Sequence, residues 1–345
     1  MRAFVVGGSG LVGRAISRRL VSAGWDVDVV GRVPGRLPSD LAGRVRFFAA
    51  DRSDSIAVAA AFGAGADLLV DCVCYTPGQA TALLPLARNS ASTVMISSKA
   101  VYADAAGRHS NSDDAAQFDG PIIETQPTVA PGDMDFTSRT GYGRNKVAAE
   151  NVLLDSGLPV SILRPSKIHG EGARPPRTWV FVKRVLDRRK AVLLAGRGRG
   201  VDHPSAAVNI AALVETVAAK PGQRILNAAD PDAPCGAEIA RVVARHLGHA
   251  WQEVLLEDDV PAPLGWHPWS RRYPVVLDTS AALDLGYVPV GDFACTVREE
   301  IDWLMSVVDH ADGARLPHGW DNGRLDGAFD YASEDRFSAL RPSVA

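Results

Sequence analysis

The chain has 345 residues, of which 46% are hydrophobic and 22% charged, and its formal net charge at pH 7 is -3. This balance is ordinary for a globular protein and argues against the strongly basic surfaces that bind nucleic acids or anionic membranes. No secretory signal pattern and no apolar run long enough to cross a membrane is present, so we expect a cytoplasmic protein. The four cysteines lack the spacing of a thiol metal site, so we expect free thiols and no metal; they are Cys72, Cys74, Cys235 and Cys295.

The first half of the chain alternates short apolar segments with segments of helical periodicity. The apolar segments are nearly continuous and rich in Val, Ile and Leu, which is typical of parallel strands buried on both faces. Such alternation predicts an α/β fold with a Rossmann-type, doubly wound parallel sheet. The expected strands are 3–7, 26–30, 45–49, 67–73, 93–98 and 159–164, and the expected helices are 11–24, 55–63, 78–89 and 142–157.

A glycine-rich segment, GGSGLVG, follows the first expected strand and opens the first expected helix. Gly7 permits a tight turn, Gly10 lets the backbone approach a pyrophosphate, and Gly13 allows the helix to pack closely on the strand. The free N–H groups at the start of the helix attract the diphosphate. In this context the segment predicts a dinucleotide site at Gly7, Gly10, Leu11, Val12 and Gly13.

The end of the second strand bears on the choice of dinucleotide. NAD-specific sites usually have an acidic residue there for the ribose 2′-hydroxyl, but this strand ends in Gly31 and Arg32. A small residue followed by Arg leaves room for a 2′-phosphate and supplies a cation, with Arg14 or Arg36 as further partners. The pattern favours NADP, and the alternative is NAD with Arg32 as a solvated loop residue.

Asp51 comes just after the third strand, where its carboxylate can reach the adenine of a dinucleotide. An alternative role is at the start of the following helix, together with Ser53 and Asp54. Both interpretations stay open at this point.

The segment RTGYGRNKVAAE carries Tyr142 and Lys146, which lie four residues apart and therefore on one face of a helix. The preceding strand ends in ISSKAVY, with Ser97 and Ser98 at its carboxyl end. Ligands bind at this edge of open α/β sheets, and a tyrosine beside an ammonium group suits proton exchange with a substrate.

The chain resembles the extended branch of the short-chain dehydrogenase/reductase superfamily, the epimerase/dehydratase-like enzymes. The segments that carry the resemblance are GGSGLVG, VMISSKAVYAD, YGRNKVAAE, ILRPSKIHGEG and VLDTSAALDLGYVPV, and it covers about residues 1–305. The resemblance implies that Tyr142 exchanges the proton, that Lys146 holds the nicotinamide ribose, and that Ser98 binds the substrate oxygen. It also implies a small-molecule substrate and a homodimer formed through the helices after the fourth and fifth strands.

Two departures from the family pattern limit the choice of reaction and substrate. Dehydratases of this branch carry an Asp-Glu pair where this chain has Lys99 and Ala100, so dehydration by that route is not expected. An arginine that binds the diphosphate of nucleotide sugars has no clear match, although Arg197 or Arg199 could serve.

Three residues are weaker candidates for substrate contact. Lys99 either binds an anionic substrate or points outward, and His169 is expected as a wall of the pocket rather than a proton relay. Tyr75, just beyond the fourth strand, either lines the nicotinamide pocket or packs in the core.

Three regions are expected along the chain. Residues 1–165 form the dinucleotide-binding domain, and residues 166–308 form a smaller mixed region that binds substrate at the sheet edge. Residues 309–345 form a polar tail that is extended or partly disordered. The long stretch 102–139 is rich in Asp, Gly, Ser and Pro, and loops of this length are usually functional lids or disordered segments.

The leading hypothesis is an NADP-dependent oxidoreductase that interconverts a ketone and a secondary alcohol on a polar small molecule. The alternative is an epimerase of a sugar or nucleotide sugar, which oxidises and re-reduces one carbon. A third possibility is a dinucleotide-binding protein without turnover, against which the Tyr142–Lys146 pair argues.

Overall fold

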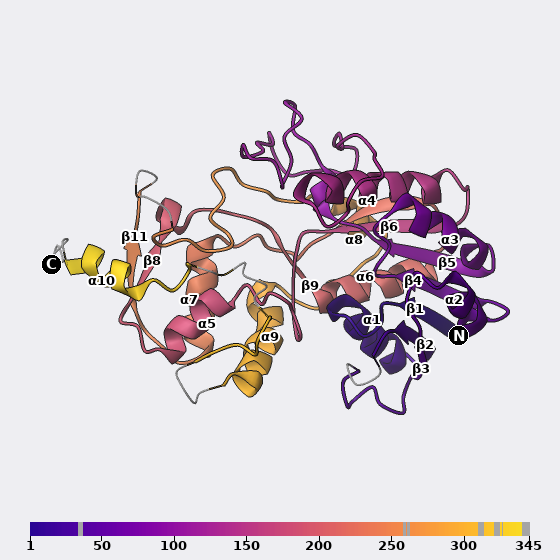
Figure 1. Ribbon diagram of the computed structural model, residues 1–345, viewed down its shortest axis with the longest axis horizontal. Helices are drawn as coiled ribbons and strands as arrows, with labels where there is room; N and C mark the ends of the chain where they lie inside the picture. Colours follow the sequence, from indigo (N-terminus) through magenta and orange to yellow (C-terminus); the bar gives the residue numbers. More distant parts are fainter. Residues whose placement is uncertain are drawn as a thin grey trace. The chain divides into compact units, whose positions relative to one another are not determined.

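The computed structural model describes residues 1–33, 37–257, 260, 263–309, 314–320, 325 and 327–339 (Figure 1). Its contacts divide the chain into two compact units, so that the chain passes from one to the other several times. The sequence instead suggested a single boundary near residue 165, between the dinucleotide-binding domain and the substrate-binding region. The first unit comprises Met1–Ile168, Ser205–Pro231 and Val276–Asp292, and the second comprises His169–Pro204, Asp232–Val275 and Phe293–Ala345. Among the described residues, no helix has the length and apolar character needed to span a membrane.

The first unit is built on a seven-stranded sheet in the order β10-β6-β5-β4-β1-β2-β3. All neighbouring strands are parallel, so the doubly wound α/β fold expected from the apolar runs is confirmed. The strand order reverses at β1, which opens a crevice at the carboxyl ends of the strands. The strands are β1 (Arg2–Val6), β2 (Asp26–Gly31), β3 (Arg46–Ala49), β4 (Ala66–Asp71), β5 (Ser90–Ile96), β6 (Val160–Pro165) and β10 (Arg224–Ala228).

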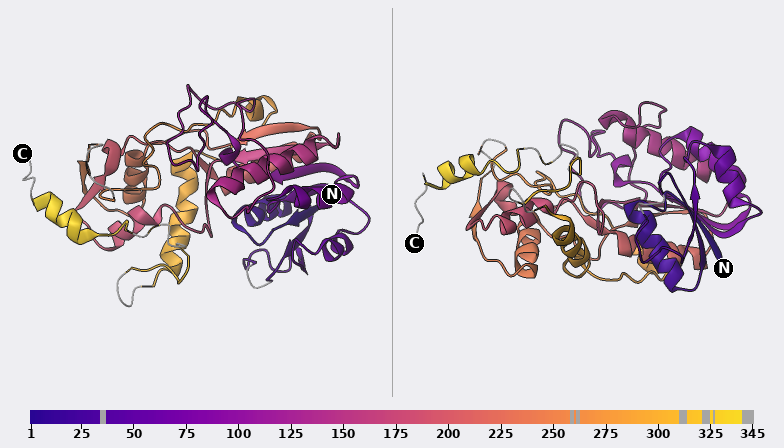
Figure 2. Two further views of the ribbon diagram at one scale, coloured as in Figure 1. Left: turned by 45° about the horizontal axis from the view of Figure 1, so that its top comes forward. Right: turned by 60° about the horizontal axis from the view of Figure 1, so that its bottom comes forward.

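Helices cover both faces of this sheet (Figures 1 and 2). Helices α1 and α6 pack together on one face, and α3 and α4 pack together on the other. Successive strand residues point to opposite faces of the sheet. Val5 therefore packs in the apolar cluster that includes residues of α1 and α6, and Phe4 packs in the cluster that includes residues of α3 and α4. The helices are α1 (Leu11–Ser22), α2 (Ser55–Phe62), α3 (Pro77–Ala87), the short η2 (Lys99–Val101), α4 (Arg139–Leu154), α6 (Ala207–Ala219) and α8 (Ser280–Asp284).

Two features of the first unit differ from the sequence-based expectation. Helix α4 begins at Arg139 rather than Tyr142, because the Ser138 hydroxyl accepts a hydrogen bond from the N–H of Gly141 at 3.0 Å and caps the helix. Helix α6 and strand β10 were assigned to the substrate region, yet β10 pairs with β6 and completes the main sheet. Buried Ile210 and Leu213 of α6 belong to the apolar cluster of that sheet.

The second unit surrounds a separate apolar cluster that contains Trp179, Phe181, Trp269 and Ile301. Its two-stranded sheet pairs β8 with β11 in parallel. Its elements are α5 (Trp179–Leu186), β8 (Ala191–Leu194), η3 (Ala195–Gly198), α7 (Gly236–His246), β11 (Gln252–Leu255), α9 (Phe293–Val307) and α10 (Tyr331–Ala339). Two further strands, β7 (Lys167–His169) and β9 (Pro204–Ala206), pair with each other.

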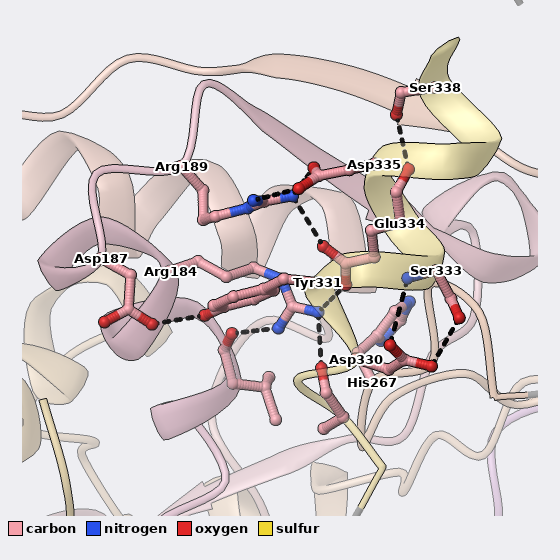
Figure 3. A network of polar contacts seen from close by, with 12 residues as sticks. Arg184, Asp187, Arg189, His267, Asp330, Tyr331, Ser333, Glu334, Asp335 and Ser338 are labelled. Carbon is pink, nitrogen blue, oxygen red and sulfur yellow. Dashed lines mark hydrogen bonds and ion pairs between the residues drawn. The ribbon is translucent and has the colours of Figure 1, made fainter. Parts of the chain in front are cut away.

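The polar tail contains a helix that its composition did not predict. Helix α10, yellow in Figure 2, lies within the segment 309–345 that we expected to be extended or partly disordered. Buried Arg184 forms an ion pair with Glu334 of this helix at 2.5 Å (Figure 3). Tertiary contacts of this kind, rather than local propensity, stabilise short helices in proteins.

Candidate active site

The glycine-rich segment from β1 into α1 leaves no room for a side chain at Gly7 or Gly13. Gly7 has a φ of +79°, which favours glycine, and a Cβ at Gly13 would lie 2.4 Å from the carbonyl oxygen of Gly7. Gly10 caps α1 without a side chain, so the first N–H groups of the helix remain accessible to an anion. The loop therefore has the geometry of a diphosphate site.

A cavity of about 420 Å³ lies at the carboxyl edge of the sheet. It is lined by residues that follow β1, β2, β3 and β4, which places it over the point where the strand order reverses. Leu11, Val12 and Gly13 lie beside it in the first turn of α1. Of the expected contacts, those that line the cavity are Gly7, Gly10, Arg32, Asp51 and Tyr75.

Several further residues that the sequence analysis did not select also line this cavity, among them Ser9, Arg52, Gln79 and Phe136. Arg52 follows Asp51 directly, so its position just after β3 could have identified it as a cavity residue. Phe136 comes from the long 102–139 stretch, where no local pattern points to the sheet edge.

The side of the cavity formed after β2 is narrow and lacks an acidic residue. A Cβ at Gly31 would lie 2.7 Å from the Ser9 hydroxyl oxygen, so a larger residue would displace that side chain. Exposed Arg32 follows and lines the cavity. Arg14 lies in α1, and Arg36 lies outside the described residues.

Asp51 and Arg52 are held in fixed orientations after β3. The Asp51 carboxylate accepts hydrogen bonds from the Ser53 hydroxyl at 2.7 Å and from the Ser53 N–H at 2.9 Å, which hold its pKa below the usual range. Asp54, not Asp51, caps α2. Arg52 donates to buried Asp71 at 2.6 Å and to the carbonyl of Gln79 at 2.7 Å, which ties the β3 side to the β4 side.

Lys146 is fixed at the ends of two neighbouring strands. Its side chain is buried, and its Nζ donates to the carbonyl oxygens of Cys74 at 2.7 Å and Ile96 at 2.9 Å. An ammonium has three N–H groups, so the same geometry allows a further bond to a ligand. The Nζ also lies 4.5 Å from the centre of the Tyr75 ring.

Tyr142 lies one turn before Lys146 on α4 and is half-buried. Its ring centre is 6.3 Å from that of Tyr75, whose pKa is raised to about 12 by burial. Tyr75 therefore stays neutral and acts as a wall of the site. A Cβ at Gly143 would lie 2.5 Å from the carbonyl oxygen of Ala100, so the first turn of α4 packs directly on η2.

Ser97 and Ser98 are adjacent but have different surroundings. The buried Ser97 hydroxyl donates to Glu150, which also forms an ion pair with Arg164 at 2.5 Å. The Ser98 oxygen accepts from the N–H of Ala100 at 3.1 Å as the cap of η2, and this bond leaves its own proton for another acceptor. Ser97 is part of a structural network, whereas Ser98 keeps a donor for a ligand.

A model of the NAD-dependent epimerase/dehydratase family matches residues 3–201, more than half of the chain. The chain belongs to this family. The resemblance to the extended short-chain dehydrogenase/reductases is thereby confirmed, and with it an enzyme that depends on a nicotinamide dinucleotide. No curated protein matches the chain.

Solved structures of epimerases and dehydratases share the fold of this family member. The UDP-glucose 4-epimerase of Thermotoga maritima has a TM-score of 0.67 at 16% identity over 89% of this chain and 99% of that chain. The dTDP-glucose 4,6-dehydratase of Bacillus anthracis, in complex with NAD, has a TM-score of 0.66 at 15% identity over 89% and 97%. The UDP-glucose 4-epimerase of Thermus thermophilus, also in complex with NAD, has a TM-score of 0.64 at 20% identity over 89% and 100%.

The remaining substrate candidates of this family member are distributed over both units. Lys99 is buried in η2 of the first unit. His169 begins the second unit and is buried with its ring centre 5.1 Å from that of Phe293, as a packing residue would be. Arg197 forms an ion pair with Glu257, and Arg199 is exposed in the same unit.

Proposed function

We propose that this chain is an epimerase-type oxidoreductase, which oxidises and re-reduces one secondary alcohol carbon of a sugar or nucleotide sugar. The observation that carries the proposal is Lys146, which is held by the carbonyls of Cys74, just after β4, and Ile96, at the end of β5, and lies one turn from Tyr142. Family membership and structural neighbours solved with NAD and UDP-sugars support it. Lys99 and Ala100, in place of an acidic pair, argue against a dehydratase.

In this proposal each residue at the sheet edge has its own role. The loop at Gly7 and Gly10 binds the diphosphate, and Lys146 donates to the nicotinamide ribose. Ser98 donates a hydrogen bond to the substrate oxygen, and the Tyr142 hydroxyl exchanges a proton with that oxygen. The bound nicotinamide dinucleotide would supply the hydride acceptor and donor.

The test is a product assay that follows both substrate and cofactor. The purified protein is incubated with UDP-glucose, UDP-glucuronic acid or dTDP-glucose, and the sugar is analysed by NMR while nicotinamide absorbance is recorded. We expect a change of configuration at one carbon without net reduction of the cofactor. Stoichiometric consumption of NADPH with a carbonyl substrate would contradict the epimerase and support a reductase.

The second candidate is an NADP-dependent reductase that interconverts a ketone and a secondary alcohol. It is favoured by Gly31 and Arg32, which give the cavity a cation and no acidic residue after β2. NADP is accordingly the cofactor that we propose in preference to NAD. Cofactor that co-purifies with the protein and resists exchange would favour the epimerase, and free exchange would favour the reductase.

We also propose that the chain is cytoplasmic and that it forms a homodimer. The dimer would use α3 and α4, which pack side by side on one face of the sheet. Sedimentation at several protein concentrations tests it, and a mass of 36.6 kDa throughout would contradict it.

A further inference from the structure

The segment 132–138 is folded against the first turns of α4. The N–H of Gly132 donates to the carbonyl of Arg144 at 3.1 Å. The fully buried side chain of Asn145 donates both to the carbonyl of Met134 at 3.0 Å and to that of Gly141 at 2.9 Å. One amide group therefore joins the segment to the helix turn that carries Tyr142.

The fit between the segment and the helix is close. A Cβ at Gly141 would lie 2.1 Å from the carbonyl oxygen of Asp135, so only glycine allows this approach. The carboxylate of Asp135 accepts from the N–H and hydroxyl of Thr137 at 2.9 and 2.7 Å, which makes a tight turn around Phe136. The direction of the Phe136 side chain thus depends on α4.

Phe136 is the side chain that this turn delivers to the dinucleotide cavity. It lines the cavity, and its ring is stacked on Tyr75 with a centre-to-centre distance of 5.4 Å and an interplanar angle of 8°. Tyr75 in turn lies under the Lys146 ammonium. The half-buried Phe136 thereby extends the wall formed by Tyr75.

The strand order identifies which half of a dinucleotide this wall would meet. Residues after β2 and β3, such as Arg32 and Asp51, lie on one side of β1, and Tyr75 follows β4 on the other side. The adenosine ribose of a bound dinucleotide is recognised after the second strand. The Tyr75–Phe136 pair therefore lies on the nicotinamide side.

We propose that Phe136 is a positioning residue that retains the cofactor: with Tyr75 it closes the nicotinamide side of the cavity and slows dinucleotide release. This inference rests on the proposed function, because an epimerase must keep its reduced cofactor until the same carbon is re-reduced. The hydrogen bonds of Asn145 link the wall to the helix of Tyr142, so retention and proton exchange depend on one local structure.

The test measures release of NADPH and NADH from the full-length protein by the fluorescence change after rapid mixing with excess oxidised dinucleotide. Loss of one aromatic contact in Phe136→Ala should speed release about two- to tenfold. Phe136→Tyr keeps the ring and should release at the wild-type rate. Ile123→Ala, at a 49% exposed position in the same long loop, is the matched control and should also match wild type.

The outcomes separate this inference from the proposed function. Release from Phe136→Ala at the wild-type rate would overturn the role of the aromatic wall. Release from Phe136→Tyr as fast as from Phe136→Ala would overturn it as well. Wild-type protein that binds a dinucleotide but turns over no sugar would contradict the epimerase, while the release rates would still decide on Phe136. Wild-type protein that binds no nicotinamide dinucleotide would overturn both.

Discussion

The sheet edge of the first unit and the α10 network of the second unit each hold a buried cationic side chain, Lys146 and Arg184, but the two cations have different partners. Lys146 donates to two uncharged carbonyl oxygens, those of Cys74 and Ile96. Arg184 instead forms an ion pair with the carboxylate of Glu334 at 2.5 Å. The charge at the sheet edge is thus held in place by neutral groups, whereas the charge in the α10 network is cancelled within the protein.

The surroundings of the two cations extend this contrast. Around α10, Arg189 forms an ion pair with Asp335 at 2.5 Å, and the Tyr331 hydroxyl donates to Asp187 at 2.7 Å, so the tyrosine is tied to a carboxylate (Figure 3). At the sheet edge, Lys146 and Tyr142 lie on one face of α4, and both are close to the ring of Tyr75, which lines the cavity. A buried pair that cancels its own charge leaves no charge for a ligand and is costly to break at one partner, whereas a cation left with neutral partners can act on a ligand.

The largest effect is expected when the group that we propose to exchange the proton is removed from the sheet edge. Tyr142→Phe keeps the ring and its packing but lacks the hydroxyl, so turnover should fall about 10²- to 10⁴-fold. Dinucleotide binding, measured by fluorescence titration, should stay close to wild type. Unchanged turnover would refute the role of Tyr142, and loss of folding or of cofactor binding would show that the hydroxyl is structural.

The corresponding change in the α10 network should affect stability rather than chemistry. Glu334→Gln leaves Arg184 buried without its carboxylate and should lower the free energy of unfolding of the second unit by about 3–5 kcal/mol. Chemical denaturation measures this loss, and replacing both partners by Arg184→Met and Glu334→Leu should recover most of it. A Glu334→Gln protein as stable as wild type would show that the ion pair does not hold α10.

A smaller effect is expected on the choice between NADP and NAD at the sheet edge. If Arg32 pairs with a 2′-phosphate, Arg32→Ala should weaken NADPH binding roughly tenfold to a hundredfold and leave NADH binding nearly unchanged. Arg88→Ala, at an exposed arginine outside the cavity, is the control. Equal loss for both dinucleotides, or no loss for either, would contradict the preference for NADP.

Much of the first unit could be predicted because its signals are local. Apolar runs mark parallel strands, the glycine loop needs particular residues at fixed positions, and Tyr142 and Lys146 share a helix face through their spacing. These rules led to the sheet, to the cavity residues Gly7, Gly10, Arg32 and Asp51, and to α4 within three residues of its start.

The features that were missed depend on contacts between distant segments. Strand β10 joins the sheet by pairing with β6, and α10 is held by Arg184, about 150 residues earlier in the chain. Phe136 reaches the cavity because Asn145 and Gly141 fix its turn against α4. No hydrophobic period or turn rule within a short window of sequence contains this information.

The smallest expected effect concerns the long loop that connects η2 to α4, at Asp104. Its buried carboxylate accepts hydrogen bonds from the N–H groups of Ala106, Arg108 and Gln117, each at 2.9 Å, and from the Arg108 side chain at 2.7 Å. Burial pushes its pKa up, but the bonds from Gln117 and Arg108 outweigh burial and hold the pKa below the usual value. The unfolded chain therefore binds this proton more tightly than the folded chain does.

It follows that the stabilisation by Asp104 is complete above the ordinary pKa of about 3.9 and is lost only as the pH falls through the lower folded value. Hydrogen exchange at the amides of Ala106, Arg108 and Gln117 should show protection that persists in mild acid and falls at lower pH. In Asp104→Asn the same amides should be weakly protected already at neutral pH. Loss of this protection in mild acid in the wild type would mean that a group other than Asp104 controls the loop. The loop would then not resemble the α10 network, in which a buried carboxylate holds its neighbours in place.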